Sequence, residues 1–202
     1  MNAGTLVGIL TTRRAEHAAA IRAASALFVT ALTAAAAQIS LPLPFTPVPF
    51  TLQPRVVLIG GAALGSRLGM TSQVLYLLAG LAGLPMFAAS PILPQGAARL
   101  IGPTGGYLMA FPIAAFVTGA LAERGFDRRY LTSVLAMAAG LAIIFTFGVT
   151  WLALVTPAGL GGAIAAGLAP FLPADIIKVF IAGAVLPAAW KITGPTERSQ
   201  DS

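Results

Sequence analysis

Apolar residues form long blocks along this chain, and most charged residues fall in the stretches between them. A helix that crosses a membrane needs about 20 predominantly apolar residues. Six blocks approach that length, at residues 23–41, 56–68, 70–88, 104–122, 131–155 and 172–190. The second block is short and contains Gly60, Gly61 and Gly65, so it either spans together with part of the preceding loop or packs closely against its neighbours. The pattern predicts an all-α membrane protein with six transmembrane helices in a compact bundle.

The connections after the first and third blocks are long and rich in proline or glycine. Residues 42–54 contain several prolines, which remove backbone donors and interrupt a helix. Residues 89–102 contain Pro91, Pro94 and Gly96. We therefore expect two long loops.

Composition agrees with a protein that lies in a bilayer. The chain is 57% hydrophobic and 9% charged, and its mean hydropathy is +0.89. A soluble domain carries roughly 25% charged residues. At 202 residues we expect one membrane domain, with an N-terminal segment at 1–22, the bundle at 23–190 and a tail at 191–202.

The basic residues predict the orientation. If the N-terminus is cytoplasmic, nine basic residues fall on the inner side: Arg13, Arg14, Arg22, Arg67, Arg124, Arg128, Arg129, Lys191 and Arg198. The outer side then holds only Arg55 and Arg99. The positive-inside rule favours this arrangement, with both termini cytoplasmic and the two long loops external. Arginines scattered between apolar blocks also argue against a nucleic-acid partner for this chain of net charge +6.

Asp175 and Lys178 are the strongest candidates for function. They lie three residues apart inside the last apolar block, so they share one face of a helix. Pro173 suits a first helical turn, which puts Asp175 in the opening turn. Ionisable groups inside a membrane are costly and usually line a pocket or pathway. The alternative is an ion pair that satisfies itself and binds nothing.

Two further stretches are candidates on the same expected outer side. Thr104, Gly105, Gly106 and Tyr107 open the fourth block, where glycine amides at a helix start can bind an acceptor. Close helix packing explains the same glycines equally well. The first loop supplies Phe50, Thr51 and Gln53, which suit either a lid over a small, partly apolar molecule or a stiff connection.

Missing motifs narrow the chemistry to binding or transport. The sequence has no cysteine, and its single histidine, His17, precedes the first block, so no metal site is expected. It has no P-loop, no H-E-x-x-H and no G-x-S-x-G motif. We therefore expect neither an enzyme nor a bound cofactor.

Five motifs, read in order, resemble one known family. They are FTPVPFTLQ at 45–53, LGSRLG at 64–69, LAGLPMF at 81–87, GPTGGY at 102–107 and PADIIK at 173–178. Together they resemble the BioY family, the biotin-binding S components of energy-coupling factor (ECF) vitamin transporters. The likeness covers about residues 23–190. In the second loop, Pro91, Leu93, Pro94 and Gln95 replace an expected glycine-rich stretch.

The resemblance implies a function and its partners. It implies six transmembrane helices, a biotin pocket near the external face and high-affinity uptake across the bacterial cytoplasmic membrane. A transmembrane coupling protein of the EcfT type and two cytoplasmic ABC-type ATPases would power uptake, so ATP is used only by the partners. Alternatives are an S component for another small vitamin, or a stand-alone secondary transporter, although the chain shows no convincing internal repeat.

Biotin carries a ureido ring, an apolar bicycle and a carboxylate tail. We expect Asp175 to accept a ureido N–H and Lys178 to donate to the ureido carbonyl. The opposite polarity, with Lys178 holding the carboxylate, stays open. The remaining expected contacts are Gln53, Phe50, Thr51, Tyr76, Thr104, Gly105, Gly106 and Tyr107.

The first block also offers a surface for the coupling protein. Ala31 and Ala35, beside Thr30 and Ala34, have the small-x-x-x-small spacing that lets helices approach closely. We expect Ala31 and Ala35 to form the docking face, while internal packing explains the spacing equally well.

Overall fold

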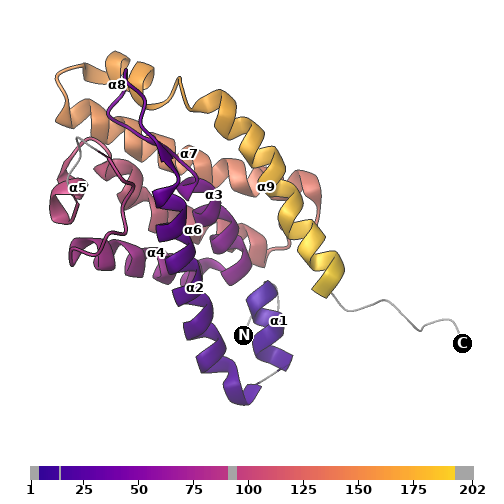
Figure 1. Cartoon of the computed structure of the whole chain (residues 1–202). Helices are drawn as coiled ribbons and strands as arrows, with labels where there is room; N and C mark the ends of the chain where they lie inside the picture. The colour runs from indigo at the N-terminus through magenta and orange to yellow at the C-terminus, as the bar shows by residue number, and fades with distance from the viewer. Residues whose placement is uncertain (1–4, 14, 91–94, 194–202) are drawn as a thin grey trace, which may run out of the picture.

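The computed structural model describes residues 5–13, 15–90 and 95–193, which are mostly helical (Figure 1). The helices are α1 (Leu6–Arg13), the 3-10 turn η1 (Ala15–His17), α2 (Ala18–Gln38), α3 (Gln53–Leu64), α4 (Ser66–Leu81), α5 (Ala97–Ile101), α6 (Gly105–Glu123), α7 (Tyr130–Val155), α8 (Gly159–Gly167) and α9 (Leu172–Thr193). Two short strands, β1 (Ser40–Leu41) and β2 (Phe50–Thr51), pair antiparallel.

Four helical stretches in the described chain are long and apolar enough to cross a membrane. They are Ala15–Gln38, Gly105–Glu123, Tyr130–Val155 and Leu172–Lys191. The predicted all-α class is thus confirmed. The second and third predicted blocks become α3, of 12 residues, and α4, of 16 residues. At 1.5 Å per residue these helices reach only about 18 and 24 Å, less than a hydrocarbon core of about 30 Å.

Helix α6 lies between α7 on one side and α3 and α4 on the other. A Cβ atom on Gly61 of α3 would lie 2.6 Å from the carbonyl oxygen of Ala115 in α6. A Cβ on Gly119 would similarly meet the backbone of Gly65 and Ser66, between α3 and α4. Only glycine permits this backbone approach, so of the two alternatives for the Gly-rich block, close packing describes the contacts that these glycines make.

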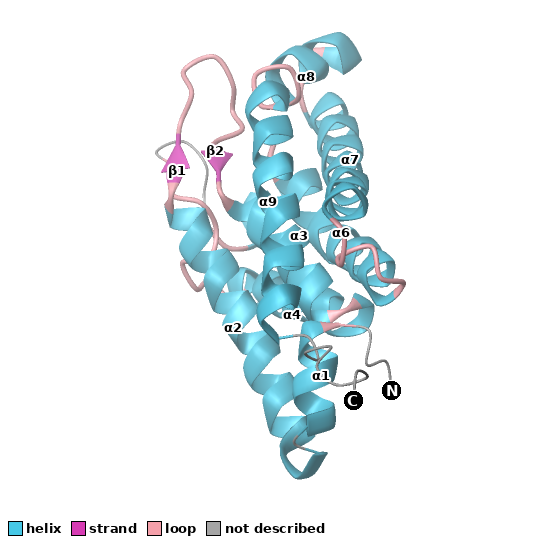
Figure 2. Ribbon diagram, turned by 90° about the vertical axis from the view of Figure 1, so that its right-hand side faces the viewer, coloured by secondary structure: helices cyan, strands magenta, loops and turns pink. Residues whose placement is uncertain are grey.

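The two long loops meet at one end of α2. Gln38, the last residue of α2, donates from Nε2 to the carbonyl oxygens of Pro85 and Phe87, at 3.2 and 3.4 Å. Ser40 Oγ donates to the Ala89 carbonyl at 3.0 Å. The second loop therefore begins earlier than predicted, after α4 ends at Leu81, and the end of α2 and the first loop hold its residues 85–89. Figure 2 shows β1, β2 and α8 at one end of the molecule and α1 at the other.

Several elements were not predicted from the sequence. The first block begins earlier than expected, at Ala18, and α1 precedes it within the expected N-terminal segment. The loops contain the β1–β2 hairpin and α5, and α8 follows α7. Of the second-loop positions singled out above, Pro91, Leu93 and Pro94 lie outside the described residues, as do Arg14 and Arg198.

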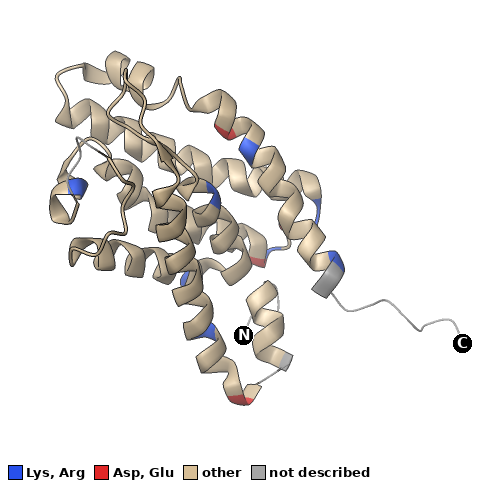
Figure 3. Ribbon diagram, viewed as in Figure 1, with Lys and Arg blue, Asp and Glu red and all other residues tan. Residues whose placement is uncertain are grey.

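Charged residues are few along the helices (Figure 3), and a polar cluster holds the C-terminal end of α9. Trp190 Nε1 donates to Asp127 Oδ2 at 2.6 Å, and the Arg128 guanidinium lies 5.0 Å from the Trp190 ring centroid. Asp127 belongs to the α6–α7 connection and is fully buried, and this burial raises the pKa of its carboxyl above its usual range. Helix α9 is thus tied to this connection at one end and carries Asp175 at the other.

Candidate functional site

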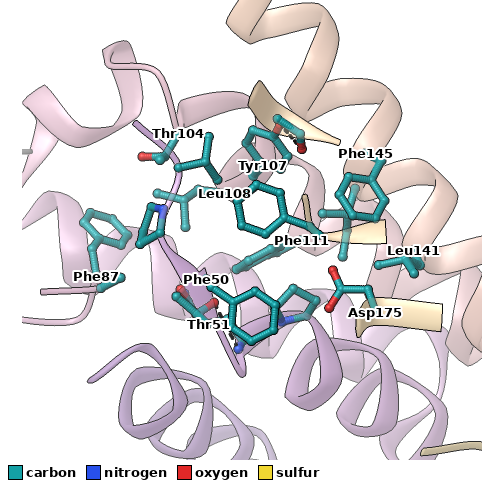
Figure 4. Close-up of a pocket in the computed structure, with 18 of the residues that line it drawn as sticks. Phe50, Thr51, Phe87, Thr104, Tyr107, Leu108, Phe111, Leu141, Phe145 and Asp175 are labelled. Carbon is teal, nitrogen blue, oxygen red and sulfur yellow. Dashed lines mark hydrogen bonds between the residues drawn. The ribbon is translucent and has the colours of Figure 1, made fainter. Parts of the chain in front are cut away.

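A cavity of about 70 Å³ lies at the hairpin end of the bundle (Figure 4). One water molecule needs roughly 10–15 Å³, so the cavity holds several. The first loop, α3, α5, α6, α7 and α9 all contribute to its wall. Most lining residues are apolar, among them Val48, Phe87, Leu108, Phe111, Leu141, Ile144, Phe145 and Phe171. Such a wall with a few polar groups is typical of a small-molecule site.

Asp175 and Lys178 form an ion pair at one end of this cavity. Lys178 Nζ lies 2.8 Å from Asp175 Oδ1, which confirms that the two share a helix face. Asp175 lies in the first turn of α9, two residues after Pro173, as the sequence predicted. Asp175 is only 8% exposed and lines the cavity. The pair therefore lies beside a cavity, and one partner remains open to a ligand.

Phe50 covers the lysine of this pair. Lys178 Nζ lies 3.3 Å from the centroid of the Phe50 ring, and that ring stacks on Phe171 at 6.1 Å. A cation over an aromatic face is attracted to the ring quadrupole. Lys178 itself is not among the residues that line the cavity. The β2 strand of the first loop thus stands between Lys178 and the cavity.

Gln53 and Tyr76 form a second polar group at the site. Gln53 Nε2 donates to Tyr76 Oη at 2.6 Å, and Tyr76 Oη donates to the Met86 carbonyl at 3.1 Å. Gln53 lines the cavity, whereas Tyr76 lies behind it and packs edge-on against Phe87. Tyr76 therefore positions Gln53 in this structure.

Some residues of the motif that opens α6 line the cavity, and the others serve close helix packing. Thr104 and Tyr107 line the cavity, and Tyr107 Oη donates to the Gly167 carbonyl at 2.8 Å. The Thr104 hydroxyl is buried without a hydrogen-bond partner in the described chain. Gly105 and Gly106 do not line the cavity.

Close packing accounts for both glycines. A Cβ on Gly105 would collide with the Leu100 carbonyl, and one on Gly106 would lie 2.6 Å from the Phe147 carbonyl oxygen. The packing alternative raised from the sequence therefore describes the contacts that these two glycines make.

Thr51 also lines the cavity, where its Oγ1 accepts the Gln53 backbone N–H at 3.3 Å. The two predicted docking residues, Ala31 and Ala35, are exposed on α2. Internal packing does not explain their spacing in the described chain, because neither alanine is buried.

Arg99 is a site residue that the sequence did not reveal. The charge pattern assigns it to the outer side as an orientation signal, but it lies on α5, is 1% exposed and lines the cavity. Its Nη2 donates to the Ala88 carbonyl, while Nη1 is buried without a partner among the described residues. Burial lowers the pKa of the Arg99 guanidinium from its usual value. The available signal was a single charge in an otherwise uncharged loop.

Arg99 and Asp175 lie at opposite ends of the cavity. Figure 4 shows Phe87 and Thr104 on one side of the site and Asp175 on the other. Arg99 bonds to the residue after Phe87, which puts it at the Phe87 end. An acidic end, an apolar middle and a cationic end suit an elongated molecule with a hydrogen-bonding head and an anionic tail.

Comparison with known proteins gives consistent matches. The model of the BioY family matches residues 10–194. The chain is 44% identical over 153 residues to a probable biotin transporter BioY of Pyrococcus horikoshii, covering 76% of this chain and 85% of that protein. It is 40% identical over 156 residues to the biotin transporter BioY of Thermotoga maritima, and this match covers 77% of this chain and 88% of that protein.

A solved structure shares the fold. The crystal structure of the S component for biotin from an ECF-type ABC transporter matches with a TM-score of 0.75 at 24% identity. The match covers 84% of this chain and 90% of that one. The helical arrangement described above is therefore found in an S component.

The cover over Lys178 predicts its chemical reactivity. The chain has two lysines, Lys178 and the exposed Lys191. Replacing Phe50 with leucine removes the ring over Lys178, so acetylation of the Lys178 amine by acetic anhydride, with acetate as the leaving group, should rise several-fold relative to Lys191. Peptide mass spectrometry measures both sites in one sample. Phe45→Leu, at an exposed ring of the same loop, is the control. Equal labelling of Lys178 in wild type and Phe50→Leu would show that the Phe50 ring does not shield Lys178.

Proposed function

The chain belongs to the BioY family, and we propose that it binds biotin with high affinity and imports it as the substrate-binding S component of an ECF-type transporter. The observation that carries this proposal is the cavity with Asp175 at one end and Arg99 at the other. The named relatives are a probable biotin transporter and a biotin transporter, which supports transport rather than catalysis as the activity.

The acidic end suits the ureido ring of biotin. Asp175 Oδ1 is held by Lys178, which leaves the carboxylate able to accept a ureido N–H on its cavity side. Lys178 donates to the ureido carbonyl once the Phe50 ring has turned aside. Charge-assisted hydrogen bonds of this kind are stronger than neutral ones. Gln53 and Thr51 add polar groups to the same wall.

The cationic end suits the carboxylate tail. Arg99 Nη1 has no partner among the described residues although it is buried, and a buried donor without a partner is costly. A ligand carboxylate at this position would satisfy Nη1 and the nearby Thr104 hydroxyl. Phe111 lies between the two ends, and Leu141 and Phe145 lie on the Asp175 side (Figure 4). These three apolar side chains line the cavity and would cover the apolar bicycle. This assignment leaves Lys178 free for the ureido group.

We also propose a membrane location, an orientation and partner proteins for this chain. We place the chain in the cytoplasmic membrane with both termini inside and six membrane-embedded helices, α2, α3, α4, α6, α7 and α9. Biotin then enters from the outer side. A transmembrane coupling protein and two ABC-type ATPases supply the energy, and no cofactor is bound by this chain. The exposed α2 surface at Ala31 and Ala35 is the proposed docking face.

The tail assignment can be tested by titration calorimetry with biotin and its neutral amide. Wild type should bind biotin at least tenfold more tightly than the amide, because the amide loses the charge-assisted contact. In Arg99→Gln this difference should shrink, whereas in Lys178→Met both ligands should weaken and the difference should persist. The reverse pattern would give the carboxylate to Lys178. Absence of heat with biotin, but binding of another vitamin, would reject biotin as the substrate.

Asp175→Asn should weaken biotin binding by at least 1.4 kcal/mol, or tenfold, because the ureido donor loses a charged acceptor. Titration calorimetry with biotin measures this loss of affinity. Asp127→Asn, at the buried aspartate of the opposite end, is the matched control and should keep wild-type affinity. Unchanged affinity in a folded Asp175→Asn protein would remove Asp175 from the site.

Ala31→Trp and Ala35→Trp should reduce co-purification with the coupling protein and ATPases, because a bulky ring prevents close helix approach. Biotin affinity should be retained. Leu131→Trp, at an exposed apolar position of α7, should leave the complex intact. A complex that survives both alanine variants would place the docking face elsewhere.

A further inference from the structure

A second hollow lies at the opposite end of α6 from the biotin site. This groove, of about 800 Å³, is formed by α1, α2, the end of α3, α4 and α6, and we call it the α1 groove. Ala120 and Glu123 near the end of α6 line it, whereas Thr104 and Tyr107 at the beginning of α6 line the cavity described above. In the proposed orientation the α1 groove faces the inner leaflet.

Two arginines on this groove form no ion pair within the part of the chain that the structure describes. Arg22 of α2 and Arg67 of α4 are both exposed and both line the groove. Within the described residues neither guanidinium has an ion pair or hydrogen bond, and Asp175–Lys178 is the salt bridge found there. Two cations on one concave surface favour an anionic ligand.

The acidic residue of the groove is already engaged. Glu123 Oε1 accepts hydrogen bonds from the backbone N–H of Ser66 at 2.8 Å and from Ser66 Oγ at 2.9 Å. Ser66 is the first residue of α4, so the Glu123 carboxylate stabilises the positive end of that helix. Glu123 therefore forms no ion pair with Arg22 or Arg67 among the described residues, and these two cations outnumber the one carboxylate of the groove.

The rest of the groove surface is partly apolar. Val7, Leu68 and Phe116 line it together with threonines of α1. The hydroxyls of Thr11 and Thr12 both donate to the Gly8 carbonyl, so they are not available as donors to a ligand. The groove thus offers two cationic donors beside apolar surface, which suits an amphiphile with an anionic head.

We propose that the α1 groove binds an anionic phospholipid of the inner leaflet, with its phosphate against Arg22 and Arg67 and its acyl chains against Leu68 and Phe116. Basic pockets between helices on the cytoplasmic side are suited to anionic headgroups. The proposal depends on the inward orientation and not on biotin as the substrate. Bound lipid would also contact α1 and hold it against α2 and α4.

The experiment uses the purified full chain in a neutral detergent. Phosphatidylglycerol, phosphatidylcholine or inorganic phosphate is added, and native mass spectrometry counts bound lipid while a thermal melt records stabilisation. Wild type should retain phosphatidylglycerol at concentrations at least tenfold lower than phosphatidylcholine. The double variant Arg22→Gln/Arg67→Gln should lose this preference. Both arginines are exposed, and a melting temperature without lipid equal to that of wild type confirms that the variant is folded.

A matched control removes the same charge elsewhere. Arg124→Gln/Arg129→Gln changes two exposed arginines that do not line the groove, and it should behave as wild type. An equal loss of the phosphatidylglycerol preference in this control would mean that net charge alone causes the preference, and it would overturn the proposed site. If inorganic phosphate displaces phosphatidylglycerol at equal concentration, the groove is an anion site without specificity for lipid. No lipid preference, together with loss of coupling-protein binding in Arg22→Gln/Arg67→Gln, would show a protein docking surface instead.

Discussion

The cost of placing charge in an apolar bundle organises the candidate site. Asp175 and Lys178 neutralise each other at 2.8 Å, and the Phe50 ring covers the ammonium on another side. Removing either partner would leave the other as a buried, unpaired charge, which is strongly destabilising. Because Lys178 holds only one carboxylate oxygen and Phe50 belongs to the first loop, the same pair both presents Asp175 to the cavity and fixes the loop above it.

The sequence predicted those parts of the fold that carry a long apolar signal. Blocks near 20 residues gave α2, α6, α7 and α9, and Pro173 gave the start of α9. Shorter elements carry no such signal: α8 and α5 have nine and five residues, and each hairpin strand has two. Their positions depend on tertiary contacts, such as the Tyr107 hydroxyl bonded to Gly167 at the end of α8.

The site was predictable where polar residues interrupt apolar ones. Asp175, Gln53 and Thr104 stand out in this way and line the cavity, whereas Phe111 and Phe145 resemble any other apolar residue of a span. Arg99 was hidden because a loop arginine reads as an orientation signal, and only the fold brings it inside. Gly105 and Gly106 show the converse: a conspicuous motif whose glycines serve the approach of α6 to α5 and α7.

Gln38 joins two regions that the sequence keeps far apart. Its side chain, at the end of α2, bonds the carbonyls of Pro85 and Phe87, and Phe87 is part of the cavity wall. Helix α2 also presents Ala31 and Ala35 on its surface, two turns or less from Gln38. A sideways displacement of α2 would therefore either move the Phe87 segment of the cavity wall or break these hydrogen bonds. Helix α2 thus couples the outer surface of the bundle mechanically to the cavity.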